Sequence, residues 1–352
     1  MPPAERLPLA RQLAAFGRPL VAELERVLAP FANGDPAGAL VELEHLGSRH
    51  GVRRVRAAVN GTVRSVIIKR LQPGAAERNR LVAGRWLPWL GLDGVAPTLL
   101  GASADAGGEA IWQIFEDVGG VTLAELSLDR ARVSAAVDLV AELHTRAAGH
   151  PVVAECRRDG RALGMPYFTA NVSDARALLD ALRPPTVHPS RQQAEVRDRL
   201  RGRLDRLLAE APRRAGLMEA EGGPDTMLHG DLFTANIIIL EEADRLRVRL
   251  IDWDHAGAGP ACYDLSTLLW RFGPAERHWI LDRYRAVVAL AGWHLPSLPV
   301  FNALCDTTER ARCSDRILWP ALALLHDGAD WAWLELETID GWFEALQPVI
   351  PA

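Results

Sequence analysis

The sequence predicts an α+β fold in which a small antiparallel sheet precedes a larger, mainly helical part. Two observations support this class. Three short runs that predict strands, 41–46, 52–59 and the β-branched run 63–69, follow one another early in the chain, and the turn pair Asn60-Gly61 joins the last two as a hairpin. From about residue 150 onward, apolar side chains instead recur at helical spacing, interrupted by Pro184-Pro185.

The remaining segments fit the same class. The chain has 352 residues, of which 49% are hydrophobic, enough for one globular unit of two lobes or two domains. Residues 1–33 have near-helical apolar spacing and are expected to pack on the smaller lobe as a helical extension. Residues 77–90 predict another helix. The tail from residue 260 is helical and rich in tryptophan, for which core packing is favoured over ligand stacking.

One of the 40 basic Lys and Arg residues is a lysine, Lys69. A codon bias toward arginine would explain this without any function. The alternative is that position 69 needs a compact ammonium group on a flexible stem, which acts as a point charge in a confined phosphate site. Lys69 ends the run 63–69, so the sequence places it on a strand of the hairpin.

Two features near Lys69 bear on that choice. The glycine-bounded loop Gly47-Ser48-Arg49-His50-Gly51 lies between the first two predicted strands. Such a loop can bring backbone N–H groups close to phosphate oxygens, although alone it is more often a simple hairpin. Glu77 is the only acidic residue between Lys69 and Asp93, and it is therefore the expected partner of the lysine.

A second polar group lies far downstream. Asp231 and Asn236 bracket a loop between two apolar strands, and Asp252 ends the next predicted strand, 246–252. Alternation along this strand places Asp252 on the apolar face, which we expect to be buried. Burial of an uncompensated carboxylate costs roughly several kcal/mol. A hard, oxygen-liganded cation such as Mg²⁺, shared with the amide oxygen of Asn236, would compensate that charge.

Together these motifs resemble those of the aminoglycoside phosphotransferase and choline kinase family, small-molecule kinases with a protein-kinase-like fold. His229-x-Asp231 with Asn236 is similar to the family's catalytic loop. Its metal-binding segment and the helix start after it resemble Ile251-Asp252-Trp253-Asp254, Gly259-Pro260 and Tyr263-Asp264-Leu265. The resemblance covers about residues 40–270, with all motifs in the family's order.

The resemblance implies a bilobal protein-kinase-like fold. The N-terminal lobe would comprise residues 1–117, including a helical extension over 1–35, and the C-terminal lobe would comprise residues 118–352. His229 is expected to brace the catalytic loop. Asp264 is expected either to cap the helix that follows it or to hydrogen-bond the backbone of that loop.

The implied activity is transfer of the γ-phosphoryl group of ATP or GTP to a hydroxyl of a small molecule. Asp231 would orient this hydroxyl and accept its proton, while Asn236 and Asp252 would hold Mg²⁺. Lys69 would bind the α- and β-phosphates and would be positioned by Glu77. The loop residues Gly47, Ser48 and Gly51 would close over the phosphates, with Ser48 adding a hydroxyl.

The segment 111–120 reads as a strand that runs into a glycine-rich turn. By resemblance it is the hinge between the lobes, where the backbone from Glu116 to Val118 would hydrogen-bond the purine base. An ordinary strand exit would have the same spacing.

The acceptor is less well defined by the sequence. Gly230 rather than arginine precedes Asp231, and Trp253 rather than Phe-Gly follows Asp252, which favours a small-molecule acceptor over a protein. An antibiotic, aminoglycoside-like or otherwise sugar-containing, is the leading class, and a choline, homoserine, sugar or fructosamine-type metabolite is the alternative. An excess of acidic residues after position 300 suits a cationic acceptor, but also a solvated helical surface. A nucleotide-binding pseudokinase or a metal-dependent hydrolase fits fewer of the motifs.

Composition excludes several other classes. The formal net charge is −5, and no lysine-rich run indicates nucleic-acid binding. The arginines Arg53, Arg54, Arg56 and Arg64 read as a solvated strand face. No apolar run approaches the roughly 20 residues of a membrane span, so we expect a cytoplasmic protein with no membrane partner. The sequence does not indicate an oligomeric state.

Overall fold

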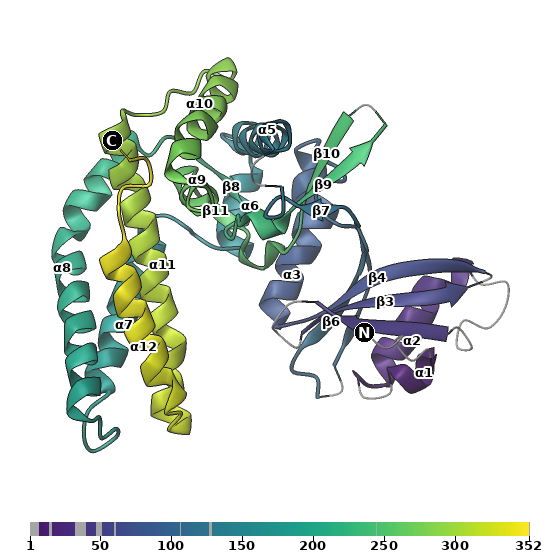
Figure 1. Cartoon of the computed structure of the whole chain (residues 1–352), viewed down its shortest axis with the longest axis horizontal. Coiled ribbons are helices and arrows are strands. Elements are labelled where there is room, and N and C mark those ends of the chain that lie inside the picture. Colours follow the sequence, from purple (N-terminus) through teal and green to yellow (C-terminus); the bar gives the residue numbers. More distant parts are fainter. Residues whose placement is uncertain are drawn as a thin grey trace. The chain divides into compact units, whose positions relative to one another are not determined.

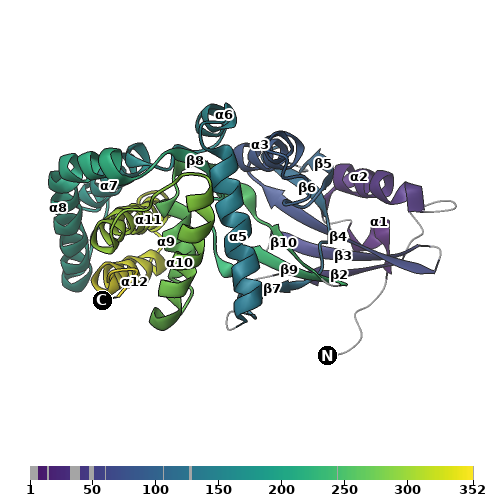
Figure 2. The same cartoon turned by 90° about the horizontal axis from the view of Figure 1, so that it is seen from above.

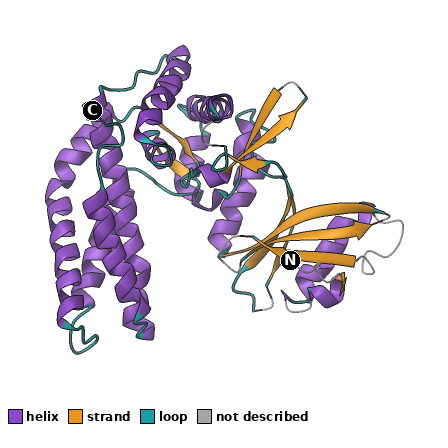
Figure 3. Ribbon diagram, viewed as in Figure 1, coloured by secondary structure: helices purple, strands orange, loops and turns teal. Residues whose placement is uncertain are grey.

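The computed structural model describes residues 7–13, 16–31, 40–46, 51–59, 61–105, 107–126, 129–243 and 245–351. The chain forms two compact units (Figures 1 and 3). The first unit comprises Met1–Leu126 and Ala235–Ala256, and the second comprises Ser127–Thr234 and Gly257–Ala352. The predicted α+β class is confirmed, because the first unit is built on a sheet and the second is mainly helical.

A six-stranded antiparallel sheet with the strand order β1-β2-β3-β4-β6-β5 is the framework of the first unit. Its strands are β1 (Leu7–Pro8), β2 (Leu40–His45), β3 (Val52–Val59), β4 (Thr62–Leu71), β5 (Leu99–Ala104) and β6 (Ile111–Glu116). The β3–β4 hairpin pairs Val59 with Thr62 and Val52 with Lys69. This register confirms the predicted two-residue turn, in which Gly61 has a φ of 75° and Asn60 lies outside the described residues.

The N-terminal helices cover one face of this sheet, as the sequence predicts. They are α1 (Leu9–Gln12) and α2 (Arg18–Leu28), and Figure 2 shows α2 alongside β5 and β6. Leu20 and Leu24 of α2 are fully buried in a cluster with Val55, Ile68 and Ile114 of the strands. Burial of these side chains contributes roughly 1.5–3 kcal/mol each, so the extension is part of the core of this unit.

The helix after β4 begins earlier than predicted. It consists of α3 (Pro73–Leu81), a π-helical turn η4 (Val82–Trp86) and α4 (Leu87–Trp89). Pro73 stands at the first helical position, where its missing N–H leaves no intrahelical bond unmade. The buried face of this helix includes Asn79, Val82 and Trp86.

The chain returns to the first unit after residue 234. A short helix, η5 (Thr234–Asn236), leads into β9 (Ile237–Glu242) and β10 (Arg245–Leu250), followed by η6 (Trp253–His255). Strand β9 pairs with both β10 and β7 (Val121–Thr122) in a three-stranded sheet. The first unit therefore extends past the expected boundary at residue 117 and includes a second stretch of chain, which a single boundary does not describe.

The second unit contains most of the helices. They are α5 (Arg130–Ala147), α6 (Val152–Asp159), α7 (Met165–Ala181), α8 (Arg191–Glu221), α9 (Cys262–Leu269), α10 (Pro274–Leu290), α11 (Leu298–Asp327) and α12 (Trp331–Ala345). A two-stranded antiparallel sheet joins β8 (Asp225–Leu228) to β11 (Gly257–Pro260). Among the described residues, no helix has both the length and the apolar character needed to cross a membrane.

Helices α7, α8, α11 and α12 pack side by side around one apolar core (Figure 1). Trp333 lies in this core, as expected of a tail tryptophan, and is 8% exposed. The expectation is wrong for Trp319, Trp331 and Trp342, which are 68%, 53% and 42% exposed. On α12, Leu336 and Phe343 lie on the buried face of the helix. Trp331 and Trp342 are eleven residues apart, which places both on the opposite face.

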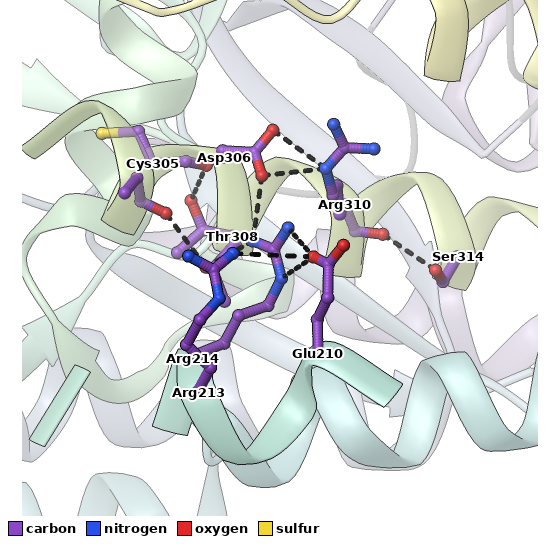
Figure 4. Close-up of polar contacts among 10 residues, drawn as sticks. Glu210, Arg213, Arg214, Cys305, Asp306, Thr308, Arg310 and Ser314 are labelled. Atoms are coloured by element: carbon purple, nitrogen blue, oxygen red, sulfur yellow. Dashed lines mark hydrogen bonds and ion pairs between the residues drawn. The ribbon is translucent and has the colours of Figure 1, made fainter. Parts of the chain in front are cut away.

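A polar network joins α8 to α11 beside this core (Figure 4). The guanidinium group of Arg214 donates to Glu210 Oε2 at 2.6 Å, to Asp306 Oδ2 at 2.9 Å and to Thr307 Oγ1 at 2.9 Å. The side chain of Arg214 is only 9% exposed. These bonds, together with a second one from Nε to Glu210, compensate the desolvation of this buried charge.

We expect Arg214→Met to lower the free energy of unfolding by about 1–3 kcal/mol, since it leaves Glu210 and Asp306 without their shared cation. Urea denaturation would measure the change. Arg213→Met is the matched control. The neighbouring Arg213 is 78% exposed, and its guanidinium nitrogen comes no nearer than 4.0 Å to Oε2 of Glu210. Equal effects of the two substitutions would contradict a structural role for the network.

Candidate active site

The first unit contains a cavity of about 230 Å³. Its walls are mostly apolar and come from the strands of the large sheet, from the segments around residues 83 and 96, and from β9 and the residues after β10. They include Val52, Ile67, Ala83, Ala96, Pro97, Phe115, Ile238 and Ile251. A mostly apolar cavity with a few polar groups is the usual form of a small-molecule site.

Lys69 stands at the polar end of this cavity, on β4. Its ammonium Nζ donates to Asp252 Oδ1 at 2.5 Å and to Asp254 Oδ1 at 2.7 Å. Burial, the strongest single influence, lowers the pKa of Lys69, but the charges and hydrogen bonds of these two carboxylates outweigh it. The pKa therefore lies above its ordinary value, and the side chain is a positive charge at neutral pH.

The expected pairing of Lys69 with Glu77 is wrong. The ion-pair partners of Lys69 among the described residues are Asp252 and Asp254. Glu77 is 51% exposed and pairs with Arg80, three residues along the same helix, at 2.6 Å. The buried face of α3 presents Asn79 to the cavity instead, since residues two apart in a helix point in different directions.

Asp252 lines the cavity but is not buried. Strand β10 ends at Leu250, so the strand alternation that predicts burial does not reach residue 252. Asp252 has φ 66° and ψ 58°, a left-handed conformation that few residues other than glycine adopt. Its side chain is 41% exposed. The turn directs the carboxylate into the cavity, where a ligand can reach it.

Asn236 lies next to this turn. Its backbone carbonyl accepts a hydrogen bond of 2.9 Å from the N–H of Ile251, the residue before Asp252. The end of η5 and the end of β10 are thus fastened together. The structure therefore brings Asn236, Asp252 and Lys69 into one region of the first unit.

The segment after β6 forms another wall of the cavity. Glu116, Asp117, Val118 and Gly119 all line it. The side chain of Glu116 accepts from the N–H of Thr98 and pairs with Arg249, so it is engaged within the protein. Among the described residues, no group accepts a hydrogen bond from the backbone N–H of Val118. That N–H remains available to a ligand.

Gly51 is the only described residue of the three predicted in the glycine loop, since Gly47 and Ser48 lie outside the described residues. The carbonyl of Gly51 accepts from the N–H of Arg70 at 2.9 Å. A Cβ atom at Gly51 would stand 3.5 Å from the carbonyl oxygen of Arg70, an ordinary contact distance. Nothing in the local geometry requires glycine there.

Asp231 belongs to the second unit, in the loop after β8. The buried carboxylate of Asp264 holds this loop by accepting from the N–H of His229 at 2.7 Å and from the N–H of Gly230 at 2.9 Å. The N–H of Asp231 in turn donates to Nδ1 of His229 at 3.3 Å. Asp264 and His229 are both 0% exposed. The expectations that Asp264 binds the loop backbone and that His229 braces the loop are both met.

Comparison with known proteins agrees with this architecture. Residues 48–299 match the model of the phosphotransferase enzyme family. The chain belongs to this family. The resemblance of the sequence motifs is thereby confirmed, and the protein is a small-molecule phosphotransferase. A search of curated proteins finds no match.

Several solved structures share the fold of this phosphotransferase. An aminoglycoside 2′-phosphotransferase in complex with GDP has a TM-score of 0.57 at 16% identity, over 93% of this chain and 100% of that one. A spectinomycin phosphotransferase in complex with ADP and spectinomycin has 0.56 at 12% identity, over 94% and 95%. An ethanolamine kinase of Plasmodium vivax has 0.55 at 14% identity, over 87% and 82%. At these identities the likeness establishes the fold alone.

One ion pair in the wall of the phosphotransferase's cavity escaped prediction from the sequence. Arg54 on β3 lines the cavity and pairs with Asp117, with 2.6 Å between Nε and Oδ2, and Ser65 donates to the same carboxylate at 2.5 Å. Burial acts most strongly on Asp117 and raises its pKa, but the bonds from Arg54 and Ser65 reverse the shift and lower it. The interpretation of Arg54 as part of a solvated strand face is wrong. Its partner lies 63 residues away, so no local pattern reveals the pair.

Asp264 gives the phosphotransferase a pH-dependent stability. Burial is the largest influence on its pKa and raises it, but hydrogen bonds from His144 and Gly230 and the nearby imidazole of His229 outweigh burial. The pKa is therefore lower in the folded protein than in the unfolded chain. The ionised carboxylate stabilises the fold fully above about pH 4, and this stabilisation is lost as the pH falls through the folded-state value.

We expect Asp264→Asn to lower the free energy of unfolding by about 2–4 kcal/mol near pH 6, because an amide cannot accept both backbone hydrogen bonds without opposing one N–H with another. Below about pH 4 the difference from wild type should shrink. Urea denaturation of both proteins between pH 3 and pH 6 would measure it. A difference that does not change with pH would contradict the ionised state of Asp264.

Proposed function

We propose that this phosphotransferase moves the γ-phosphoryl group of ATP or GTP to a hydroxyl of a small molecule, with a sugar-containing antibiotic as the leading acceptor class. The observation that carries the proposal is the placement of Lys69 and Asp252 together at the polar end of an apolar cavity. An apolar cavity suits a purine base, and a cation with a carboxylate suits the polyphosphate that extends from it.

The nucleotide would bind in the first unit. Its base would lie between the apolar walls and accept a hydrogen bond from the N–H of Val118. A backbone carbonyl near Glu116 would accept a hydrogen bond from the base. The Lys69 ammonium would hold the α- and β-phosphates as a compact point charge. Solved structures of similar fold contain ADP or GDP, which supports a nucleotide donor of either kind.

Asn236 and Asp252 would hold Mg²⁺. The donor set fits this ion, which prefers oxygen ligands and is usually bound by one or two carboxylates together with substrate phosphates. Asp252 supplies an exposed carboxylate in the cavity, and Asn236 is fastened one residue from it through the N–H of Ile251. When bound, the ion would neutralise charge on the β- and γ-phosphates.

Asp231 would be the catalytic base. It would accept the hydrogen bond of the acceptor hydroxyl, orient its oxygen toward the γ-phosphorus and take up the proton as the new bond forms. The loop that carries Asp231 is held through the backbone of His229 and Gly230 by Asp264. A fixed loop keeps the carboxylate in position, and positioning supplies much of the catalysis in phosphoryl transfer.

An antibiotic acceptor is supported by the fold, which is shared with enzymes solved in complex with spectinomycin and with kanamycin. A specific observation weakens the argument for a polycationic acceptor, and the metabolite alternative is therefore kept as the second candidate. Of the acidic residues after position 300, Asp306, Glu309, Asp340 and Glu344 are paired with arginines of the same unit. Their charge is already compensated, so the excess of acids in the sequence overstates the attraction for a polycation.

The test is a screen for acceptor-dependent formation of ADP or GDP by the purified protein with Mg²⁺. One panel contains aminoglycoside, spectinomycin-type and macrolide antibiotics, and a second contains choline, ethanolamine, homoserine, sugars and fructosamines. Turnover with the first panel supports the antibiotic proposal, and turnover with the second alone supports a metabolite kinase. Nucleotide binding without turnover on either panel would favour a pseudokinase.

A further inference from the structure

Asp254 is engaged more extensively than any role in the proposed mechanism requires. Its Oδ1 atom accepts from Lys69 Nζ at 2.7 Å and from Asn79 Nδ2 at 2.8 Å. Its backbone carbonyl accepts from Arg78 Nε at 2.7 Å. Asp254 therefore connects β4 to helix α3 through three bonds, all within the first unit.

The two carboxylates on Lys69 differ in their surroundings. Asp252 lines the cavity and is 41% exposed, whereas Asp254 does not line it and is 20% exposed. A ligand in the cavity can take Asp252 away from the lysine but has less access to Asp254. Asp254 is thus the partner suited to remain on Lys69 while the site is in use.

Helix α3 contributes an amide where the sequence leads one to expect an acid. Asn79 is 6% exposed and donates both to Asp254 and to the carbonyl of Ala75, so its side chain is fixed in the wall of the cavity. Glu77 stands on the exposed side of the helix with Arg80. The connection between the helix and the lysine runs through Asn79 and Asp254, and the negative charge comes from the η6 turn.

We infer that Asp254 is the residue that positions Lys69, with Asn79 fastening it to α3, in place of an acidic residue on that helix. The inference rests on the proposed function of the site. Lys69 would be held by one shielded carboxylate, and Asp252 would be left for the metal. Once Asp252 binds a cation, the single ammonium of Lys69 is left to compensate Asp254, so that neither carboxylate stands without a positive partner.

A competing role for Asp254 is a second metal ligand. The two roles predict different responses to substitution. Replacing a metal ligand by its amide weakens Mg²⁺ binding, so that turnover needs a higher Mg²⁺ concentration and saturating Mg²⁺ restores it. A positioning residue replaced by its amide releases the lysine, and no concentration of Mg²⁺ restores it.

The lone lysine allows the inference to be tested without any catalytic readout. Because Lys69 is the only lysine, an amine-reactive ester labels one side chain besides the N-terminus, and mass spectrometry of the peptide that contains it measures the rate. We expect Asp254→Asn to accelerate labelling of Lys69 about fivefold or more, as one of two ion pairs is lost. Asn79→Ala should act in the same direction, and the double substitution should add less than the sum of the two.

Glu77→Gln is the comparison variant, because it removes the acid that the sequence favours. Labelling unchanged in Glu77→Gln and faster in Asp254→Asn supports the inference, whereas the reverse pattern overturns it. Thermal unfolding of each variant shows whether it folds, and Asn79→Ala provides the test should Asp254→Asn not fold.

In the active enzyme, we expect Asp254→Asn to lower kcat about 10-fold or more at saturating Mg²⁺. Full recovery at high Mg²⁺ would assign Asp254 to the metal instead. Labelling remains informative even if no acceptor is turned over, so failure of the proposed function and failure of this inference are distinguishable.

Discussion

Replacement of Asp231 by asparagine is expected to lower kcat by about 10²–10⁴-fold while leaving nucleotide affinity within about twofold of wild type. An amide can still accept a hydrogen bond from the acceptor hydroxyl, but it cannot take up the proton. The loss therefore falls on the chemical step. Steady-state kinetics with the acceptor found in the screen, together with calorimetric titration of the nucleotide, would measure both quantities.

Two features make this substitution a clean test. The side chains of asparagine and aspartate have nearly the same size, and the loop around residue 231 is held by backbone bonds to Asp264 and His229 rather than by the carboxylate alone. Asp225→Asn, at the start of β8 on the same approach to the loop, is the matched control, since Asp225 is exposed and pairs with Arg157. An increase of KM with unchanged kcat in Asp231→Asn would contradict its assignment as the base.

Lys69→Arg is expected to lower kcat/KM by about 10²–10³-fold while the fold survives. The side chain is 14% exposed and fits between Asp252 and Asp254 in a confined space. A planar guanidinium group is larger and directs its donors in a fixed fork, so it cannot take the place of a compact ammonium on the phosphates. Kinetics at varied nucleotide concentration, with circular dichroism to confirm folding, would measure the effect.

Arg70→Lys is the matched control for this exchange. Arg70 is the next residue on β4, is 44% exposed and pairs with Asp105 away from the cavity. We expect wild-type kinetics from it, since the charge and the exposed ion pair are retained. Wild-type turnover in Lys69→Arg would mean that the single lysine reflects codon bias and not a requirement of the site.

The elements that the sequence predicts best are those with local signals. The β3–β4 hairpin follows from the strand-forming runs on either side of Asn60-Gly61, and in the structure it pairs Lys69 with Val52. The apolar spacing of the N-terminal helices likewise anticipates their burial against the sheet. In each case the determining interactions lie within a few residues of one another.

The errors concern partners that are distant in the sequence. Lys69 pairs with carboxylates 183 and 185 residues away. Glu77 is predicted as its partner only because it is close to Lys69 in the chain. The helix of Glu77 begins at Pro73, and this phase turns Asn79 rather than Glu77 toward the cavity. Similarly, the predicted burial of Asp252 is wrong because β10 ends at Leu250 and Asp252 itself adopts a left-handed conformation. Strand alternation does not reveal where the strand ends.

The division of the chain shows the same limit. Residues 235–256 join the first unit because β9 pairs with β7, more than 110 residues earlier in the chain. Nothing in the composition of residues 235–256 marks their return to the first unit, and the segments before and after them in the chain belong to the second unit. Motif order, in contrast, identifies the family correctly, since residues 48–299 match the model of the phosphotransferase enzyme family.

We propose that this phosphotransferase transfers the phosphoryl group to its acceptor through Asp231. Phosphorus NMR of a reaction containing ATP or GTP, Mg²⁺ and the acceptor from the screen tests it most directly, with Asp231→Asn in parallel. We expect a new phosphomonoester signal that grows as the γ-phosphate signal declines, and no such growth with the variant. Accumulation of inorganic phosphate without a phosphomonoester would indicate hydrolysis, and equal rates for both proteins would place the chemistry elsewhere. Either result would overturn phosphoryl transfer to a small molecule through Asp231.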